Sequence, residues 1–247
     1  MPVSADALPD DAGKKKEYDQ VIMRVFTQLQ SAEPQADRLS FTKADIERAV
    51  SELGLNVRNV PDIAYTYRTG RSPLPAGILA YGNWAIDGAG KSKYIFVKLT
   101  RSPYVDIPTD IEIVRVLDAT PQIVLKYQSR DEQALLARIR YNRLIDTFTG
   151  LTAYHLQGHF RTTVKNVGQV EIDDLYIGID TDGNSFILPL EAKSAAPKDK
   201  LGVVQITSMV KFSRQYFPEL AMRPIGVKVL GDDSYLFMEF NDSSYIK

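Results

Sequence analysis

The sequence contains no cysteine among its 247 residues, which excludes both a disulfide framework and a metal site built on thiolates. No stretch approaches the roughly 20 apolar residues that a membrane-spanning helix needs. The segment Met1–Lys16 is polar and lacks the apolar region of a secretion signal. The formal net charge is −1, so a nucleic-acid partner would have to be bound by a local basic patch. These features predict a soluble, cytoplasmic protein.

What the sequence does contain is the composition of an ordinary globular protein, with 44% hydrophobic and 25% charged residues. Its length suits one large or two small domains. The pattern of expected elements favours two, a small α+β domain over residues 1–118 and an α/β domain over residues 119–247. In the second domain we expect a mixed sheet flanked by helices.

Three helices are expected in the first domain, after a mobile tail at residues 1–13. The first spans 14–30, where apolar residues recur at helical spacing. The second follows Thr42, a suitable N-cap with Asp45 as its capping partner. The third spans 61–69 and begins with a proline, which suits a first helical turn. The buried stripe of the second helix is expected to consist of Ile46, Ala49, Val50 and Leu53.

A β-hairpin is expected after the third helix, with strands at 84–86 and 94–97 around the Gly-rich turn 87–91. Three helices followed by a hairpin is the order of a winged helix-turn-helix, whose third helix enters the major groove of DNA. The alternative is a small α+β domain whose tyrosines and arginines simply face water. We favour a winged-helix-like domain that binds double-stranded DNA through arginines, tyrosines and wing lysines, namely Arg58, Tyr65, Tyr67, Arg68, Arg71, Lys91 and Lys93.

The second domain is expected to begin after β-branched residues at 111–116 and 123–125, which predict two short strands or a connecting segment. A helix follows with Leu135, Leu136, Ile139, Leu144 and Ile145 inward. Its flank carries Arg138, Arg140 and Arg143, which are expected to form a solvated face or, as the alternative, to lie along a nucleic-acid backbone. The remaining elements alternate as in an α/β sandwich. From this helix onward, the expected order is a helix at 131–148, strands at 160–167, 170–179 and 185–193, a helix at 201–217, and strands at 225–230 and 234–240.

Three charged residues in this domain have a spacing that suits metal-dependent hydrolysis. Asp174 lies on the strand expected at 170–179, and Glu191 and Lys193 end the strand expected at 185–193. Residues two apart on a strand point to the same face, so Glu191 and Lys193 project together. A hairpin between these strands brings a carboxylate on one strand beside a carboxylate and a lysine on the other. Such a site holds a divalent metal and activates water, which indicates phosphodiester hydrolysis.

Strand parity also favours one aspartate over its neighbour as a metal ligand. Asp173 has the parity of the apolar residue Leu175, so Asp174 falls on the opposite face with Tyr176. We therefore prefer Asp174 as the ligand. Two carboxylates and a backbone carbonyl suit Mg²⁺, which keeps several waters, with Mn²⁺ as a substitute metal.

The set formed by Asp174, Glu191-Ala192-Lys193 and Gln205 on the following helix resembles the PD-(D/E)XK nuclease superfamily, whose fold is called restriction-endonuclease-like. The resemblance covers about residues 131–230. It implies that Asp174 and Glu191 bind Mg²⁺, that Lys193 assists hydrolysis, and that Gln205 orients substrate or catalytic groups.

One departure from the family's pattern leaves the choice of ligand open. The residue before Asp174 is Asp173, where the motif has proline, so Asp173 and Glu171 stay as rival ligands. Such folds also often place an acidic residue on the helix before the hairpin, for which Glu132 and Asp146 are candidates.

Two other metal-binding patterns are present only in part. Residues 180–191 have carboxylates at several EF-hand positions, but Ser185 stands where the glycine is needed and the flanks are strand-like, so a turn is expected. His155 and His159 have the spacing of a zinc-protease helix, but Leu156 replaces the required glutamate. We interpret the histidines as ordinary polar residues at a helix end or loop, or as a strand entry facing DNA.

Together the two domains look most like a type II restriction endonuclease. We expect a Mg²⁺-dependent endonuclease that hydrolyses phosphodiester bonds of double-stranded DNA at specific sequences, with Arg161 as a further phosphate contact. Cutting both strands needs two active sites, which is consistent with a homodimer. Two alternatives stay open. One is a repair or junction-resolving nuclease selective for DNA structure, and the other is a non-catalytic DNA-binding regulator that kept the fold.

Overall fold

The computed structural model describes residues 10–108, 110–127, 132–231 and 234–241. The chain separates into two compact units, Met1–Pro103 and Tyr104–Lys247. This division falls earlier than the boundary expected at residues 118/119. The reason is that Tyr104 forms a β-bridge with Gly202, and the Val105 N–H donates to the carbonyl of Leu201 at 2.9 Å, which ties the start of the connecting segment to the second unit.

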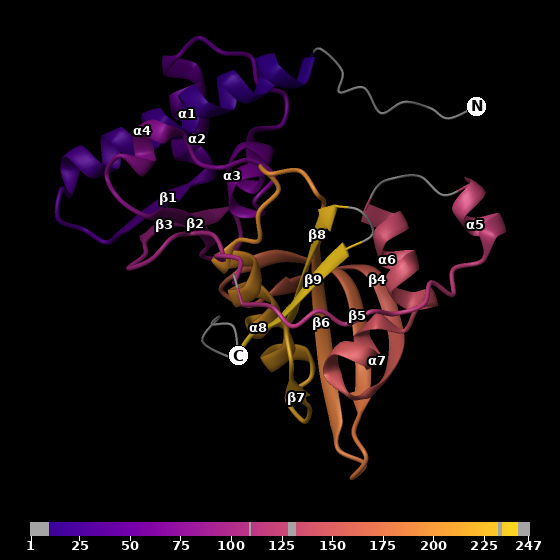
Figure 1. Cartoon of the computed structure of the whole chain (residues 1–247). Coiled ribbons are helices and arrows are strands. Elements are labelled where there is room, and N and C mark those ends of the chain that lie inside the picture. Colours follow the sequence, from indigo (N-terminus) through magenta and orange to yellow (C-terminus); the bar gives the residue numbers. More distant parts are fainter. Residues whose placement is uncertain (1–9, 109, 128–131, 232–233, 242–247) are drawn as a thin grey trace. The chain divides into compact units, whose positions relative to one another are not determined.

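The first unit combines helices with a three-stranded antiparallel sheet of strand order β1-β3-β2 (Figure 1). Its core contains an aromatic cluster, in which Phe26 meets the rings of Trp84 and Phe96 edge to face. Such contacts combine large apolar burial with favourable ring geometry. The elements are α1 (Asp10–Ala32), β1 (Arg38–Thr42), α2 (Lys43–Glu52), α3 (Val60–Arg68), α4 (Ala76–Leu79), β2 (Trp84–Gly88) and β3 (Lys93–Lys98).

The three predicted helices and the hairpin of this unit are confirmed. The Asp45 carboxylate accepts the Thr42 backbone N–H at 2.8 Å and its hydroxyl at 2.7 Å, as the capping pattern predicted. Two predictions are wrong. Leu53 is exposed because it follows the last turn of α2, and α1 begins at Asp10, inside the segment expected to be a tail. Residues 1–9 of that segment lie outside the described residues.

Strand β1 was not predicted, because its five residues follow a loop and are too few for a clear alternation. Its inward side chains are Leu39 and Phe41, and its outward ones are polar. The strand pairs along its full length with β3, from Arg38 opposite Val97 to Thr42 opposite Lys93. It therefore converts the predicted hairpin into a sheet.

The second unit is built on a six-stranded mixed sheet flanked by helices, which confirms the coarse prediction of its fold (Figure 1). The strand order is β4-β5-β6-β8-β9, with β7 beside β6. Strand β6 is antiparallel to β5 and parallel to β8. The elements are α5 (Gln122–Tyr127), α6 (Glu132–Tyr141), α7 (Leu144–Thr149), β4 (Thr152–Val164), β5 (Gly168–Ile179), β6 (Ser185–Lys193), α8 (Val203–Tyr216), β7 (Ala221–Met222), β8 (Ile225–Gly231) and β9 (Ser234–Glu239).

Separate apolar clusters cover the two faces of this sheet. One contains Phe212 of α8 together with Leu175 and Ile187 from the sheet. The other contains Ile139 of α6 together with Leu190. The alternation of side chains along β5 and β6 therefore divides their residues between a face covered by α8 and a face covered by α6 and α7. Within the described part of the chain, no helix is long and apolar enough to span a membrane.

Three predictions for the second unit are corrected. The helix expected over 131–148 is broken into α6 and α7, because Arg143 adopts a left-handed backbone conformation with φ 48°. The strand expected from 160 begins at Thr152, so His155 and His159 lie on β4 instead of at a helix end or loop. Residues 123–125 belong to helix α5 and are not a strand.

The connecting segment before α5 is anchored at both ends. Its start is held by the Val105–Leu201 hydrogen bond described above. At its end, the Asp118 carboxylate accepts hydrogen bonds from Arg138 at 2.6 Å and Asn142 at 3.0 Å. The described residues between these anchors form no helix or strand, which agrees with one of the two predicted options. Large apolar side chains are exposed there, namely Ile107, Ile111, Ile113, Val114, Val116 and Leu117.

Candidate functional site

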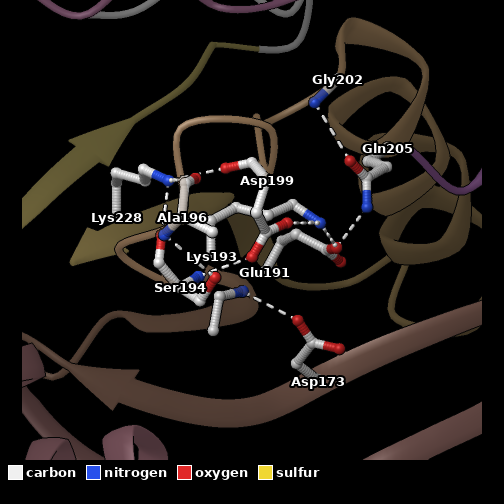
Figure 2. A network of polar contacts seen from close by, with 10 residues as sticks. Asp173, Glu191, Lys193, Ser194, Ala196, Asp199, Gly202, Gln205 and Lys228 are labelled. Carbon is white, nitrogen blue, oxygen red and sulfur yellow. Dashed lines mark hydrogen bonds and ion pairs between the residues drawn. The ribbon is translucent and has the colours of Figure 1, made fainter. Parts of the chain in front are cut away.

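The end of strand β6 brings three of the predicted site residues together (Figure 2). Glu191 and Lys193 are both buried, and the Lys193 Nζ donates to Glu191 Oε1 at 2.8 Å. The Gln205 side-chain amide, on the first turn of α8, donates to the same oxygen. Its Oε1 accepts the Gly202 N–H at 3.0 Å, which fixes the orientation of the amide. The carboxylate of Glu191 is thus held by two donors from different elements.

Lys193 is kept charged by its surroundings despite its burial. Burial by itself would lower the pKa of this lysine, but attraction to Glu191 and the hydrogen bond with it outweigh burial and raise the pKa above its usual value. Asp199, whose Oδ1 lies 3.8 Å from Nζ, and Asp173 act in the same direction. The site therefore contains a buried cation beside carboxylates.

The structure places Asp173, and not Asp174, beside this group. Asp174 pairs with Leu190, so its side chain lies on the sheet face covered by α6, whereas Glu191 is one residue further and points to the opposite face. Regular pairing ends there, and the Asp173 Oδ2 accepts the Ala192 N–H at 2.8 Å (Figure 2). The parity of Asp174 with Tyr176 is as predicted, but the expected pair of Asp174 and Glu191 is not brought together.

Asp174 is instead the centre of a second polar cluster. Its carboxylate is 0% exposed and accepts hydrogen bonds from Arg140 at 2.6 and 3.0 Å and from the Tyr176 hydroxyl at 2.8 Å. His155 Nε2 lies 2.9 Å from the same carboxylate. Burial, followed by the nearby charge of Asp174, raises the pKa of Tyr176 well above its usual range. Asp174 therefore ties β5 to α6 and β4, a role that satisfies a buried charge.

The other acidic candidates have protein partners of their own. Glu171 is bound by Arg161 at 3.0 Å, so Arg161 also has a carboxylate partner. Asp146 pairs with Arg143 and accepts the Ala153 N–H at 3.0 Å. The side chain of Glu132 lies outside the described residues. The residues of the EF-hand-like pattern form a turn, as predicted, in which the Asp180 carboxylate accepts the Asn184 N–H at 2.8 Å.

Among the seven residues of the first unit predicted to contact DNA, four are exposed, one is partly buried and two are buried. The exposed residues are Arg58, Arg71, Lys91 and Lys93. Tyr65 is partly buried, and the guanidinium of Arg71 lies 4.8 Å from its ring centroid. Tyr67 and Arg68 are in the interior of the unit, where the Tyr67 hydroxyl donates to Asp19 at 2.7 Å. These two side chains do not face solvent.

Two residues near the site were missed by the sequence reasoning. Asp199 accepts the Ser194 N–H at 2.7 Å and lies near Lys193, but the loop that carries it has no periodicity to reveal its position. Lys228 on β8 is paired with Lys193 through the parallel register of β6 and β8. Only the long-range pairing of these strands shows that the two lysines are neighbours.

Asp173 and Glu191 are the residues of this site whose chemistry would suit a hard divalent cation. Asp173 and Glu191 are carboxylates from adjacent strands, joined by the Ala192 segment, and Mg²⁺ needs only one or two carboxylates because it keeps several waters. Among the described residues, no group of three or more His, Cys, Asp or Glu side chains is placed to hold a metal ion. No family model, curated protein or solved structure matches the chain. The chemistry of the site is therefore inferred from its own residues.

Proposed function

We propose that this protein is a Mg²⁺-dependent endonuclease that hydrolyses phosphodiester bonds of double-stranded DNA. The observation that carries the proposal is the buried Glu191 carboxylate, which receives hydrogen bonds from Lys193 and Gln205 at a strand end where Asp173 also lies. A structural ion pair needs no second carboxylate and no amide from a neighbouring helix. Carboxylates and a charged lysine gathered at a sheet edge suit phosphoryl chemistry.

The roles follow from the geometry. Asp173 and Glu191 would hold the metal, which when bound lowers the pKa of a water and stabilises charge on the phosphate. Lys193, kept protonated by Glu191, would place a positive charge where negative charge grows in the transition state. Gln205 would fix Glu191, because its own amide is oriented by Gly202. Relative to the sequence-based assignment, Asp173 takes the place of Asp174.

The arrangement of elements supports membership of the PD-(D/E)XK superfamily. Strands β5 and β6 form the hairpin that carries Asp173 and the Glu-x-Lys segment, and α8 follows with Gln205. The sheet is mixed and has helices on both faces. In this proposal the second unit is a restriction-endonuclease-like domain.

The first unit is proposed as a winged-helix-like DNA-binding domain. Its order of three helices and a hairpin, with β1 completing a sheet of order β1-β3-β2, supports this assignment. Three exposed cations would contact phosphates: Arg71, which follows α3, Lys91 in the β2–β3 turn, and Lys93 at the start of β3. Such a domain would make the enzyme a sequence-specific, restriction-type nuclease, acting as a homodimer to cut both strands.

The proposal is tested by incubating a large DNA of diverse sequence, methylated and unmethylated, with the protein and Mg²⁺, Mn²⁺ or a chelator. We expect discrete metal-dependent fragments that are lost in the Glu191→Gln variant. The exposed Glu219 provides a matched control, since Glu219→Gln should cut like the wild type. A smear, or preference for a branched junction, would indicate a structure-selective nuclease. Tight binding that Glu191→Gln leaves unchanged, with no cleavage under any metal, would overturn the proposal and favour a regulator.

The DNA-binding role of the first unit has a separate test in the salt dependence of affinity. Replacing Lys91 and Lys93 with alanine should weaken binding to all sequences and reduce the slope of log affinity against log salt by about 1 for each lysine that contacts a phosphate. Lys15 and Lys16, exposed on α1, serve as the matched control pair. An unchanged slope in the Lys91→Ala/Lys93→Ala variant would remove the β2–β3 turn from the DNA interface.

A further inference from the structure

The ammonium group of Lys228 is bound by three backbone carbonyls of a single loop (Figure 2). Its Nζ donates to the carbonyl of Ala196 at 2.9 Å, to that of Asp199 at 2.7 Å, and to that of Ser194. A protonated lysine has three N–H donors and no acceptor, so each donor meets one carbonyl. All three carbonyls belong to residues 194–199, which directly follow Lys193. Lys228 therefore gathers this loop around one positive charge.

The conformation of this loop depends on polar contacts and not on apolar packing. Its side chains are small or polar and mostly exposed, so apolar burial contributes little there. Inside the loop, the Asp199 N–H donates to the Ala196 carbonyl at 3.0 Å, and the Ala196 N–H donates to the Ser194 hydroxyl at 3.4 Å. The Ser194 N–H also donates to the Asp199 carboxylate at 2.7 Å. Both ends of this contact carry carbonyls that Lys228 binds. Loss of the ammonium would remove a hydrogen-bond donor from three carbonyls at once, and only that of Ala196 would keep a donor within the loop, the Asp199 N–H.

The loop also connects the two side chains that hold Glu191. It begins immediately after Lys193, and it leads through Gly202 to Gln205 at the start of α8. Asp199, inside the loop, lies 3.8 Å from the Lys193 ammonium. Lys193 and Lys228 are paired directly in the β6–β8 register. Because their two positive charges repel each other, each ammonium needs its own anionic or carbonyl partners. The carbonyls supply the partners of Lys228, so Lys193 stays directed at Glu191.

We propose that Lys228 is a positioning residue for the active site, which fixes the loop 194–199 and through it the placement of Lys193 and Gln205 on Glu191. The expected effect of Lys228 on DNA cleavage rests on the proposed function. The expected effect of Lys228 on the conformation of the loop is independent of that function. Because Lys228 acts on the arrangement of catalytic groups and not on DNA contacts, its loss should lower kcat and leave KM unchanged.

The experiment uses the full chain with two variants. Lys228→Met keeps the apolar stem but removes the donors, and Lys228→Ala also leaves space for a small ammonium ion. Hydrogen exchange of the Ser194 amide should be faster in both, while the core amides of β5 stay protected, which shows that the fold is retained. The cleavage kcat should fall about 10- to 100-fold, the range for residues that orient metal-site groups. Lys126→Ala, at an exposed lysine of α5, is the matched control.

Chemical rescue separates a positioning role from a general loss of packing. Methylammonium should restore slow Ser194 exchange and part of kcat in Lys228→Ala, because it supplies N–H donors to the vacated carbonyls. Tetramethylammonium has the same charge but no N–H donor, so it should restore neither. Wild-type exchange and wild-type kcat in Lys228→Met would overturn the proposal. If the wild-type protein cuts no DNA, the proposed function fails. The hydrogen exchange of the Ser194 amide in the Lys228 variants, and its restoration by methylammonium, still decide whether Lys228 fixes the loop.

Discussion

Asp173 and Asp174 are adjacent on β5, yet they serve two different regions of the molecule. Asp174 is completely buried, and Arg140, His155 and Tyr176 surround its carboxylate. Asp173 lies where the pairing of β5 with β6 ends, and its carboxylate caps the Ala192 N–H beside the Glu-x-Lys segment. Because neighbouring residues on a strand face opposite ways, a shift of one residue separates a structural cluster from a candidate catalytic one.

The comparison shows how the surroundings of a carboxylate indicate its role. Asp174 has a guanidinium and a phenol as partners, which satisfy its charge in the folded protein and leave it no exposure to solvent. Asp173 accepts the N–H of Ala192, the residue between Glu191 and Lys193, and its charge contributes to the raised pKa of Lys193. Only the second arrangement belongs to the metal site proposed above.

Asp174→Ala should have the largest effect, a loss of about 3 kcal/mol in the free energy of unfolding of the second unit, because it leaves the partly buried Arg140 and the buried Tyr176 hydroxyl without their common partner. Denaturant unfolding followed by circular dichroism measures this loss. The single tryptophan, Trp84, lies in the first unit, so its fluorescence provides an internal reference. The double variant Asp174→Ala/Arg140→Met should lose less stability than Asp174→Ala alone. A loss below about 1 kcal/mol, the size of an exposed ion pair, would return Asp174 to the candidate metal ligands.

Asp173→Asn should separate stability from activity. Asparagine keeps an oxygen that can accept the Ala192 N–H. The free energy of unfolding should therefore change by less than about 1 kcal/mol, which is the contribution of an ordinary hydrogen bond. Metal-dependent cleavage should fall by more than about 100-fold. Substitution of residues that only orient the ligands already lowers metal affinity or activity by about 10- to 100-fold. Isothermal titration with Mg²⁺ should show weaker binding. Full cleavage by this variant would contradict the assignment of Asp173 as a ligand.

Tyr176→Phe should have the smallest effect of the three and refine the description of the Asp174 cluster. It removes one neutral donor to a carboxylate that keeps Arg140, so we expect a loss of about 1 kcal/mol in unfolding free energy. Cleavage should be unchanged, because the hydroxyl lies on the face opposite Glu191. Reduced cleavage without reduced stability would show that the two faces are coupled.

Much of the candidate site was predictable because it depends on local patterns. The alternation in β6 places Glu191 and Lys193 on one face, and the helix that follows begins at the right place to present Gln205. The longer helices and strands likewise follow from periodicity, whereas the short elements β1 and α5 do not. The mixed sheet with flanking helices is confirmed by the structure.

What could not be predicted depends on contacts between distant parts of the chain. The register of β5 with β6 decides which aspartate meets Glu191, and strand parity alone does not give it. The parallel pairing of β6 with β8, which makes Lys228 a neighbour of Lys193, has no local signal. In the first unit, Tyr67 and Arg68 lie on the buried side of α3 together with Ile63 and Ala64, a helical spacing that their polar groups concealed.

The two anchors of the connecting segment make its length largely independent of the rest of the fold. The Val105–Leu201 and Asp118–Arg138 contacts hold the segment at both ends, so residues added between them would lengthen a loop whose ends stay fixed. Doubling the length of a flexible loop costs only about 0.6 kcal/mol. The chain can therefore acquire an insertion here, such as an epitope, a fluorescent domain or a targeting module, without any change in the sheet that carries Asp173 and Glu191.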